Sequence, residues 1–291
     1  MNTSKVLIFS DLDGTLLDHF TYQFDSAKQT IAQLNSAGVA IILNTSKTCV
    51  ETLSIRKELA VTSPFIVENG AAVFIPKATF ATAPEDTVSH EDYWLKEFSS
   101  PRAYYLDLLD SHTDDFKNQY QHFSGMSIEQ LSELTGLTLS QATQAKARKY
   151  GEPVHWLGDE HSKKHFITQL RRLGANVIQG GRFMHVGGHC NKGHALSWLT
   201  KQYQILQNTK FSTIALGDGE NDISMLEAAD IAIQVRSPVH DFPVLLKQNN
   251  TVKTKEYGPK GWSQALQELL FEAPSLDTNL STSLKKEVNY G

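Results

Sequence analysis

Two short apolar segments of this chain each end directly in a turn rich in aspartate. Residues 6–9 (VLIF) lead into DLDGT at positions 11–15, and residues 213–216 (TIAL) lead into GDGEND at positions 217–222. A short apolar run between polar turns is typical of a strand buried on both faces of a parallel sheet. Because ligands bind beyond the carboxyl ends of such strands, we expect both acidic turns at the same edge of one sheet.

Strand-like and helix-like segments alternate at both ends of the chain. After the first strand, a helical pattern covers about residues 25–37, and apolar strands at 39–43 and 65–67 enclose a second helix at about 48–59. The same alternation returns after residue 192. Strands separated by helices predict right-handed crossovers and a parallel sheet. The expected fold class is α/β, with a Rossmann-like parallel-sheet core.

The middle of the chain has a different texture, polar and weakly patterned from residue 77 to about 120. Beyond it, Ser127 and Thr138 are each followed three residues later by Gln, which predicts two helix starts with capping boxes. This block predicts an α+β cap domain inserted into the core. The expected divisions are residues 1–85 (first core segment), 86–187 (cap), 188–273 (second core segment) and 274–291 (flexible tail).

Composition limits the partners and the compartment. The 291 residues carry a net charge of -5, without the clustered Lys and Arg that are typical of nucleic-acid-binding proteins. No stretch approaches the ~18 apolar residues of a membrane helix, and the first apolar run is too short for a signal peptide. Two cysteines, Cys49 and Cys190, are too few for a disulfide scaffold and favour a reducing compartment. We therefore expect a cytoplasmic protein that binds neither nucleic acid nor membranes.

Asp11, Asp13, Asp218 and Asp222 are the candidate metal-binding and catalytic residues. Carboxylates that converge in one cleft repel each other unless a cation joins them. Oxygen ligands with open positions suit Mg²⁺, which keeps substrate phosphate and water in its shell. A calcium loop needs ligands at alternate positions over about twelve residues, a pattern that neither turn has. Taken alone, DLDG is as easily an ordinary surface turn, so the magnesium hypothesis depends on both turns.

Two further segments are candidates for phosphate binding. Thr45 and Ser46 end the second strand and precede a helix, where hydroxyls and helix-start N–H groups suit phosphoryl oxygens. Lys192 opens the helix of the second core segment and offers a fixed positive charge. A lysine at a helix start is usually only solvated, so neither segment is specific by itself.

The order and spacing of DLDGT, Thr45, Lys192 and GDGEND resemble the four motifs of the haloacid dehalogenase-like hydrolases. The middle block is similar to the larger type of cap domain in that superfamily. The resemblance implies that Asp11 is the nucleophile and Asp13 the general acid and base. It also implies that Thr45 and Lys192 bind the phosphoryl group.

The same resemblance implies how Mg²⁺ is held. The ion is expected on Asp11, on the backbone carbonyl of Asp13 and on Asp218, with Asn221 and Asp222 in support. The chemistry of phosphoryl transfer is consistent with these roles, because its catalysis depends mainly on in-line positioning of the reacting groups and on stabilisation of the phosphoryl charge. A carboxylate nucleophile divides hydrolysis into two easier displacements.

Four shorter segments resemble the mannosyl-3-phosphoglycerate phosphatases, which release the compatible solute mannosylglycerate. They are TSKT (45–48), ENG (68–70), AKARKYGEP (145–153) and GGRFMH (180–185). The resemblance implies that Arg148 and Arg182 grip the glycerate carboxylate and the phosphate, and that Glu68 and Asn69 meet sugar hydroxyls. The implied substrate-binding residues are Lys47, Glu68, Asn69, Arg148, Arg182 and His185. The expected partner is a small-molecule sugar phosphate.

Several activities stay open on the residues alone. A glucosyl substrate differs from a mannosyl one by the configuration of one hydroxyl, which no motif reads, and sucrose phosphate is a third possibility. A phosphosugar mutase uses the same aspartyl-phosphate. A catalytically dead sugar-phosphate sensor is disfavoured, because Asp11 and Asp13 are both present. The sequence does not give the oligomeric state.

The thiols and histidines suggest two further sites, which we weigh less. His185, His189, Cys190 and His194 fall within ten residues, but their spacing matches no standard zinc pattern. Cys49 stands at a predicted helix start, where the pKa of a thiol can fall, although a small buried thiol is the commoner case.

Overall fold

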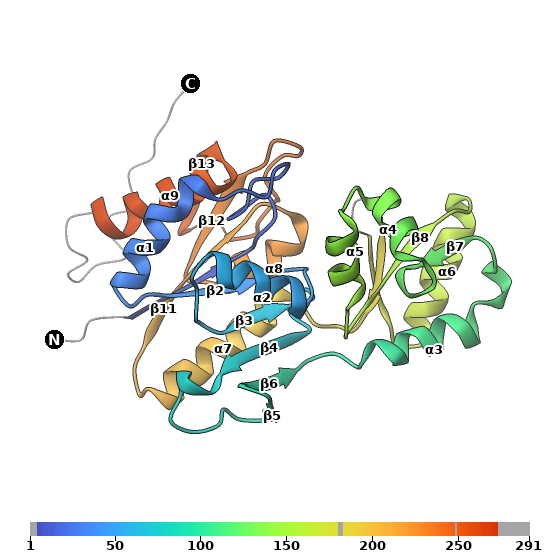
Figure 1. The fold of residues 1–291 in the computed structure, drawn as a ribbon, viewed down its shortest axis with the longest axis horizontal. Helices are drawn as coiled ribbons and strands as arrows, with labels where there is room; N and C mark the ends of the chain where they lie inside the picture. The colour runs from blue at the N-terminus through green and yellow to red at the C-terminus, as the bar shows by residue number, and fades with distance from the viewer. Residues whose placement is uncertain (1–4, 180–182, 248, 273–291) are drawn as a thin grey trace. The chain divides into compact units, whose positions relative to one another are not determined.

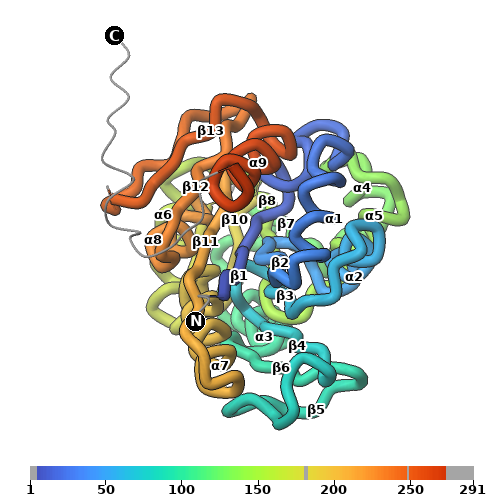
Figure 2. Tube along the Cα trace, turned by 90° about the vertical axis from the view of Figure 1, so that its left-hand side faces the viewer, coloured from blue at the N-terminus to red at the C-terminus, as the bar shows by residue number. Residues whose placement is uncertain are grey.

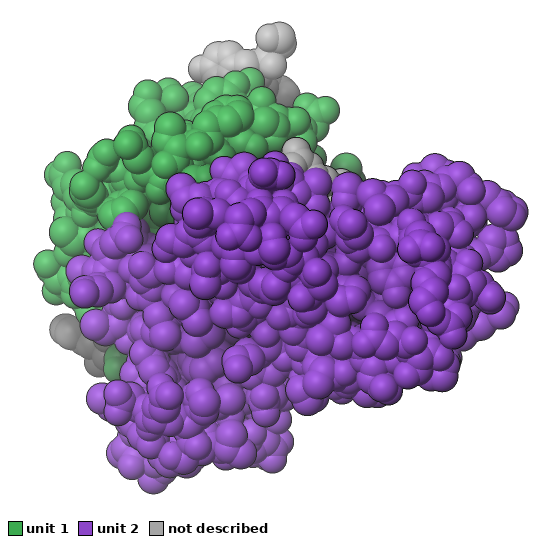
Figure 3. Space-filling model, turned by 45° about the vertical axis from the view of Figure 1, so that its right-hand side comes forward, with its two compact units in different colours: residues 1–41, 210–291 green, residues 42–209 purple. Residues whose placement is uncertain are grey.

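The computed structural model describes residues 5–179, 183–247 and 249–272. Contacts divide the chain into two compact units, which Figure 3 shows in different colours. Unit 1 comprises residues 1–41 and 210–291, and unit 2 comprises residues 42–209. The domain boundaries expected from the sequence stay predictions.

Unit 1 contains four parallel strands in the order β13-β12-β11-β1 (Figure 1). They are β1 (Lys5–Ser10), β11 (Phe211–Gly217), β12 (Ile231–Arg236) and β13 (Thr251–Tyr257). The apolar runs of β1, β11 and β12 are buried, as expected for strands covered on both faces. Because all four strands run the same way, their carboxyl ends lie at one edge.

The helices of unit 1 are α1 (Lys28–Ser36), α8 (Ile223–Ala228) and α9 (Gly258–Gln267) among the described residues. Figures 1 and 2 show α1 and α9 side by side, and α9 packs on β12 and β13 while α8 packs on β11 and β12. Ala27, Ile31 and Leu34 are buried, which confirms the predicted apolar face of the first helix. Gly38, at φ +68°, follows its end. Short helical turns complete the unit at Asp25–Ala27, Glu220–Asp222 and Glu268–Glu272.

One sheet of unit 2 has the order β2-β3-β4-β6-β5. Its strands are β2 (Ala40–Asn44, with residues 40 and 41 counted in unit 1), β3 (Phe65–Val67), β4 (Ala72–Pro76), β5 (Val88–His90) and β6 (Tyr93–Glu97). Strands β2 and β3 are parallel, and the later pairs are antiparallel. The helix α2 (Cys49–Glu58) contacts β3, and α7 (Lys192–Leu206) contacts β4. Strands β5 and β6 lie in the polar segment that begins at residue 77, where the sequence shows no clear pattern. Strand β5 is exposed throughout, so it has no apolar run that would mark it as a strand.

The second sheet of unit 2 is antiparallel, in the order β7-β8-β10-β9. Its strands are β7 (Tyr120–His122), β8 (Glu152–Trp156), β9 (Asn176–Gln179) and β10 (Met184–Gly187). The flanking helices are α3 (Arg102–His112), α4 (Ile128–Thr135), α5 (Leu139–Lys146) and α6 (Glu160–Arg172). Single helical turns lie at Lys77–Thr79, Asp114–Phe116 and Phe123–Gly125.

Helices cover both faces of this second sheet. Val154 of β8 packs in one core with residues of α3 and α6, whereas the next residue, His155, contacts Phe183, which packs against α4 and α5. Successive side chains of a strand point to opposite faces, so the two helix pairs lie on opposite sides. Both predicted capping boxes, at Ser127 and Thr138, are present. The fold class expected from the sequence is confirmed: an α/β protein with a parallel-dominated sheet and an α+β block.

No helix among the described residues has both the length and the apolar character that a membrane span requires.

Candidate active site

Three aspartates from the two acidic turns converge in unit 1. Asp11 follows β1, and Asp218 and Asp222 follow β11, which is the parallel neighbour of β1. All three are buried, and each offers a carboxylate oxygen within 4.8 Å of the other two. The two turns therefore meet at one edge of the sheet, as the strand pattern predicts.

The DLDGT turn is folded by backbone hydrogen bonds. Asp11 N donates to Leu216 O (2.9 Å), which ties the turn to β11, and Gly14 N donates to Leu17 O (2.9 Å). Gly14 has φ +78°, and a Cβ at this position would lie 2.5 Å from Oδ2 of Asp218. Any side chain at position 14 would strain the backbone and displace that carboxylate.

Neighbouring groups orient the converging carboxylates. Thr15 Oγ1 donates to Oδ1 of Asp218 (2.9 Å), and Oδ2 of Asp222 accepts from the backbone N–H groups of Asp218 (3.1 Å) and Gly219 (3.0 Å). His240 Nε2 lies 3.4 Å from Oδ2 of Asp218. Sequence reasoning missed the roles of Thr15 and His240. The role of Thr15 could have been predicted, because this residue belongs to the DLDGT motif. No sequence pattern links His240 to the acidic turns.

Asp13 and Asn221 belong to the same two turns. Asp13 is half-buried and forms an isolated bridge with Leu17. Asn221 is exposed within the turn Glu220–Asp222. Their predicted roles, general acid and base for Asp13 and support for Asn221, stay predictions.

The three buried aspartates fit a metal ion. Two carboxylate charges no more than 4.8 Å apart repel each other by at least about 3 kcal/mol at an effective dielectric constant near 20. A bound cation replaces that repulsion with attraction, and an all-oxygen ligand set favours a hard cation. Among the His, Cys, Asp and Glu side chains of the described residues, these three aspartates lie close enough together to hold one metal ion. The segment from His185 to His194 contributes to no such group among those residues.

Thr45 and Lys192 are both buried in unit 2. Thr45 follows β2 directly, and Lys192 opens α7 with a fully buried side chain. Asn44 Nδ2 donates to the backbone O of Lys192 (3.0 Å), so the end of β2 is bound to the start of α7. The side chain of Asn191 caps α7 by accepting from His194 N (2.8 Å). The sequence places Asn44 at the end of the second strand beside Thr45 but does not predict its hydrogen bond to Lys192.

The loop after β2 is bound to the turn after β3. Asn69 N donates to Thr45 O (2.9 Å), and Glu68 N donates to Lys47 O (3.0 Å). Within the loop, Lys47 N donates to Thr45 Oγ1 (3.2 Å). Ser46 joins the same region through its backbone O, which accepts from Arg148 Nη2 (2.8 Å). The structure thus brings six sequence-predicted residues of unit 2 into one connected set: Thr45, Ser46, Lys47, Glu68, Asn69 and Arg148.

His185 lies on β10 near Arg148. Burial, together with the positive charge of Arg148, lowers the pKa of His185 to about 4, so its imidazole is neutral at neutral pH. Burial also raises the pKa of the Cys49 and Cys190 thiols to about 11. Cys49 is therefore a protected thiol despite its place at the start of α2.

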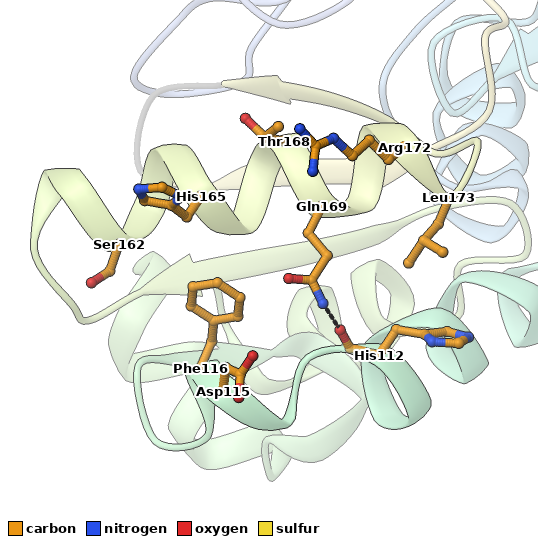
Figure 4. A pocket seen from close by; sticks show the side chains of 9 residues that line it. All are labelled: His112, Asp115, Phe116, Ser162, His165, Thr168, Gln169, Arg172 and Leu173. Atoms are coloured by element: carbon orange, nitrogen blue, oxygen red, sulfur yellow. Dashed lines mark hydrogen bonds between the residues drawn. The ribbon is translucent and has the colours of Figure 1, made fainter.

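Two features lie outside this set. Arg182 falls outside the described residues. A hollow between α3 and α6, drawn in Figure 4, is lined by residues with no predicted role. They are His112, Asp115, Phe116, Ser162, His165, Thr168, Gln169, Arg172 and Leu173. Its one drawn hydrogen bond joins the Gln169 side chain to the backbone of His112.

Comparisons with known proteins show the family of the chain and its fold. A family model described as haloacid dehalogenase-like hydrolase matches residues 8–240. The chain is 35% identical over 266 residues to a glucosyl-3-phosphoglycerate/mannosyl-3-phosphoglycerate phosphatase of Methanococcoides burtonii. The aligned region covers 91% of this chain and 97% of that relative. A protein of the same name from Persephonella marina is 32% identical over 274 residues, covering 92% and 98%.

A solved structure shows the same fold at lower identity. It is a phosphatase of the haloalkanoate enzyme superfamily from Bacteroides thetaiotaomicron, with a TM-score of 0.61, 18% identity and coverage of 91% of this chain and 95% of that one. The family match spans both acidic turns, and the relatives at 32 and 35% identity span nearly the whole chain. The chain therefore belongs to the haloacid dehalogenase-like hydrolases, in the family of the glucosyl-3-phosphoglycerate/mannosyl-3-phosphoglycerate phosphatases.

Proposed function

We propose that the chain is a Mg²⁺-dependent phosphatase that hydrolyses mannosyl-3-phosphoglycerate, glucosyl-3-phosphoglycerate or both. The observation that carries the proposal is the convergence of Asp11, Asp218 and Asp222 at the carboxyl ends of β1 and β11. The substrate class is supported by the names of the two relatives. Both relatives are named for the two sugars together, so we include the glucosyl substrate with the mannosyl one.

The proposed chemistry has two displacements on phosphorus. A carboxylate oxygen of Asp11 attacks the phosphorus, and the bond from phosphorus to the glycerate C3 oxygen breaks. Asp13 gives a proton to that leaving oxygen, so the sugar-glycerate departs as an alcohol. Asp13 then takes a proton from a water, which attacks the phosphorus of the aspartyl-phosphate and releases inorganic phosphate and the free Asp11 carboxylate.

The remaining residues bind and orient. Thr45 is assigned to hydrogen-bond a phosphoryl oxygen through its hydroxyl, and Lys192 to pair its ammonium group with the phosphoryl charge. Asp11, the carbonyl of Asp13 and Asp218 would hold Mg²⁺, which neutralises charge on the transferring phosphoryl group when bound. Asp222 accepts two backbone N–H groups of the turn 217–222 and so keeps Asp218 in place. The ammonium group of Lys192 is buried, and its charge therefore acts on the phosphoryl group in a region of low dielectric constant.

The test is a phosphate-release assay on a panel of substrates. Purified protein is given mannosyl-3-phosphoglycerate, glucosyl-3-phosphoglycerate, sucrose phosphate and common hexose phosphates, with Mg²⁺ and with excess EDTA. We expect the two 3-phosphoglycerate substrates to have the highest kcat/KM, and EDTA to abolish release until Mg²⁺ is restored. Release that persists in EDTA contradicts the metal, and a preferred hexose phosphate contradicts the substrate class.

Two variants test the nucleophile. Asp11→Asn should abolish phosphate release while the protein still folds and binds substrate, because the amide cannot attack phosphorus. Asp25→Asn, at an exposed carboxylate paired with Lys28, is the matched control and should keep full activity. Turnover retained by Asp11→Asn would refute the aspartyl-phosphate. A mutase would instead return the phosphoryl group to a sugar and need a sugar bisphosphate activator, so phosphate release without such an activator separates the two activities.

A cytoplasmic location stays part of the proposal. It rests on the small number of cysteines, which favours a reducing compartment.

A further inference from the structure

The turn after β3 contains an unusual backbone. Glu68 and Asn69 have φ of +48° and +59°, so two consecutive residues with side chains occupy the left-handed region. That region costs a residue other than glycine about 1 kcal/mol or more. Such strain persists where the surroundings hold it, and here both backbone N–H groups donate to the loop after β2, at Lys47 O and Thr45 O. The turn therefore fixes the direction of the Glu68 side chain.

The carboxylate of Glu68 is buried and fully engaged. Oε1 accepts from Lys149 N (2.8 Å), and Oε2 accepts from Tyr150 N (3.2 Å). Arg148 Nε lies 3.4 Å from the same Oε2, and the two side chains are only 9% and 3% exposed. A buried carboxylate that is paired in this way with a guanidinium and two backbone N–H groups is well compensated for its lost hydration.

Arg148 closes a ring of contacts with the loop after β2. Its Nη2 donates to Ser46 O (2.8 Å), while the backbone N of Glu68 donates to Lys47 O (3.0 Å). The guanidinium of Arg148 is thus held at two points, by an ion-pair contact with the Glu68 carboxylate and by a hydrogen bond to the Ser46 carbonyl, and its buried Nε makes no hydrogen bond with any described residue. A planar guanidinium held in this way presents its other N–H groups in one direction.

These contacts point to a role for Glu68 that differs from contact with sugar hydroxyls. We propose that Glu68 is a positioning residue, which orients Arg148 for the anionic glycerate end of the substrate. The inference rests on the proposed function for the substrate, and on the sequence resemblance for the assignment of Arg148 to its glycerate end. It does not rest on that function for the coupling between the two side chains, which the geometry alone supports.

Other contacts hold the segment after Arg148 when Glu68 is changed. Arg102 N donates to Lys149 O, Ser99 Oγ donates to Tyr150 O (3.2 Å), and Tyr150 OH donates to Oε1 of Glu97 (2.8 Å). Loss of the Glu68 charge should therefore leave the path of residues 149–150 in place. The consequence should fall mainly on Arg148.

The first experiment separates positioning from folding. Glu68→Gln is assayed with glucosyl-3-phosphoglycerate and with p-nitrophenyl phosphate, which has neither the glycerate nor the sugar. We expect KM for the first substrate to rise about tenfold or more, because one partner of a buried charge pair is removed, with kcat within about threefold. Kinetics on p-nitrophenyl phosphate should stay within about twofold. Equal losses on both substrates would show a merely structural role and overturn the proposal.

Glu97→Gln is the matched control, because Glu97 contacts the same segment through Tyr150 and not through Arg148. It should leave KM for both substrates unchanged. A rise in KM equal to that of Glu68→Gln would overturn the assignment to Glu68.

A double-mutant cycle tests whether Glu68 acts through Arg148. In the Arg148→Ala background, Glu68→Gln should have no further effect on KM, because the group that it orients is gone. Multiplicative effects of the two changes would overturn the proposal.

A second cycle, in urea unfolding, needs no substrate. The effects of Glu68→Gln and Arg148→Ala on the unfolding equilibrium constant should be coupled by at least about threefold. If the wild type hydrolyses p-nitrophenyl phosphate but neither 3-phosphoglycerate substrate, the proposed function fails, and this cycle still decides the pairing. Coupling below about threefold would overturn it.

Discussion

Thr15 Oγ1 donates a hydrogen bond of 2.9 Å to Oδ1 of Asp218, although 203 positions separate the two residues in sequence. Both groups are buried, and the bond joins the turn after β1 to the turn after β11. A residue that hydrogen-bonds a metal-binding carboxylate fixes its orientation, and loss of such a partner typically weakens metal binding 10- to 100-fold.

We expect Thr15→Val to raise the Mg²⁺ concentration needed for half-maximal phosphate release by about 10- to 100-fold. Valine keeps the shape of the side chain but removes the donor to Asp218. Thr15→Ser retains the hydroxyl and should restore a near-normal Mg²⁺ dependence. An unchanged Mg²⁺ titration for Thr15→Val would mean that this hydrogen bond does not support the metal site.

Gly14 and Gly38 allow the effect of a steric clash to be separated from the effect of backbone strain. Both have positive φ (+78° and +68°), but a Cβ at Gly14 meets Asp218 at 2.5 Å, whereas a Cβ at Gly38 meets nothing within 4 Å. Gly38→Ala should cost about 1 to 2 kcal/mol of stability and leave the Mg²⁺ dependence unchanged. Gly14→Ala should carry a similar strain and also lose most activity. The check is urea unfolding beside phosphate release, and equal activities of the two variants would contradict the close approach.

His185 should make stability fall as the pH is lowered from 7 to 5. Its pKa is lowered to about 4 in the folded protein, against about 6.5 when the chain is unfolded. Between these values the unfolded chain binds the proton and the folded protein does not, so acid favours unfolding. The neutral His185 imidazole makes its full contribution to the free energy of unfolding above about pH 6.5. At pH 5 the free energy of unfolding is lower by about 2 kcal/mol at most because of this residue.

Urea unfolding of the wild type and of His185→Gln at both pH values measures this effect. The variant should lose less stability between pH 7 and 5 than the wild type does. A wild-type loss no larger than that of His185→Gln would show that the imidazole titrates normally.

The two thiols should react slowly in the native protein. Burial raises the pKa of Cys49 and Cys190 to about 11, so the reactive thiolate at pH 8 is scarcer by about two orders of magnitude than for an ordinary cysteine. Labelling with a disulfide reagent at pH 8 should therefore be slow in the native state and rapid for both thiols in guanidinium. Fast native labelling of Cys49 would restore the hypothesis of an activated thiol at the start of α2.

Much of the acidic site could be predicted because its physical cause is local. Each of Asp11 and Asp218 directly follows a short apolar strand, and parallel strands bring their carboxyl ends together. Asn44, by contrast, shows its role only through a carbonyl 148 positions away, at Lys192. Spacing along the chain carries no information on such contacts.

The part of the fold that escaped prediction has weak local signals. Strand β5 is exposed throughout, and β13 is buried at few positions, so neither has the apolar run that marks a strand in the core. Contact of Glu68 with sugar hydroxyls stays a prediction, and the sequence did not indicate that its carboxylate accepts two backbone N–H groups and pairs with Arg148. A sequence shows that an acid is present in a turn but not which of several donors it accepts from.

Gly70 leaves no room between the turn after β3 and the first residues of α7. It has φ +90°, and a Cβ there would lie 2.2 Å from the carbonyl O of Asn191, immediately before Lys192. Even the methyl group of alanine would have to push the backbone of that helix start aside. Among random variants selected for activity, position 70 should consequently return glycine alone, whereas the open position 38 should accept substitutions at a modest cost. The lack of space at this one residue thus limits which sequences the turn can adopt, in evolution or by design.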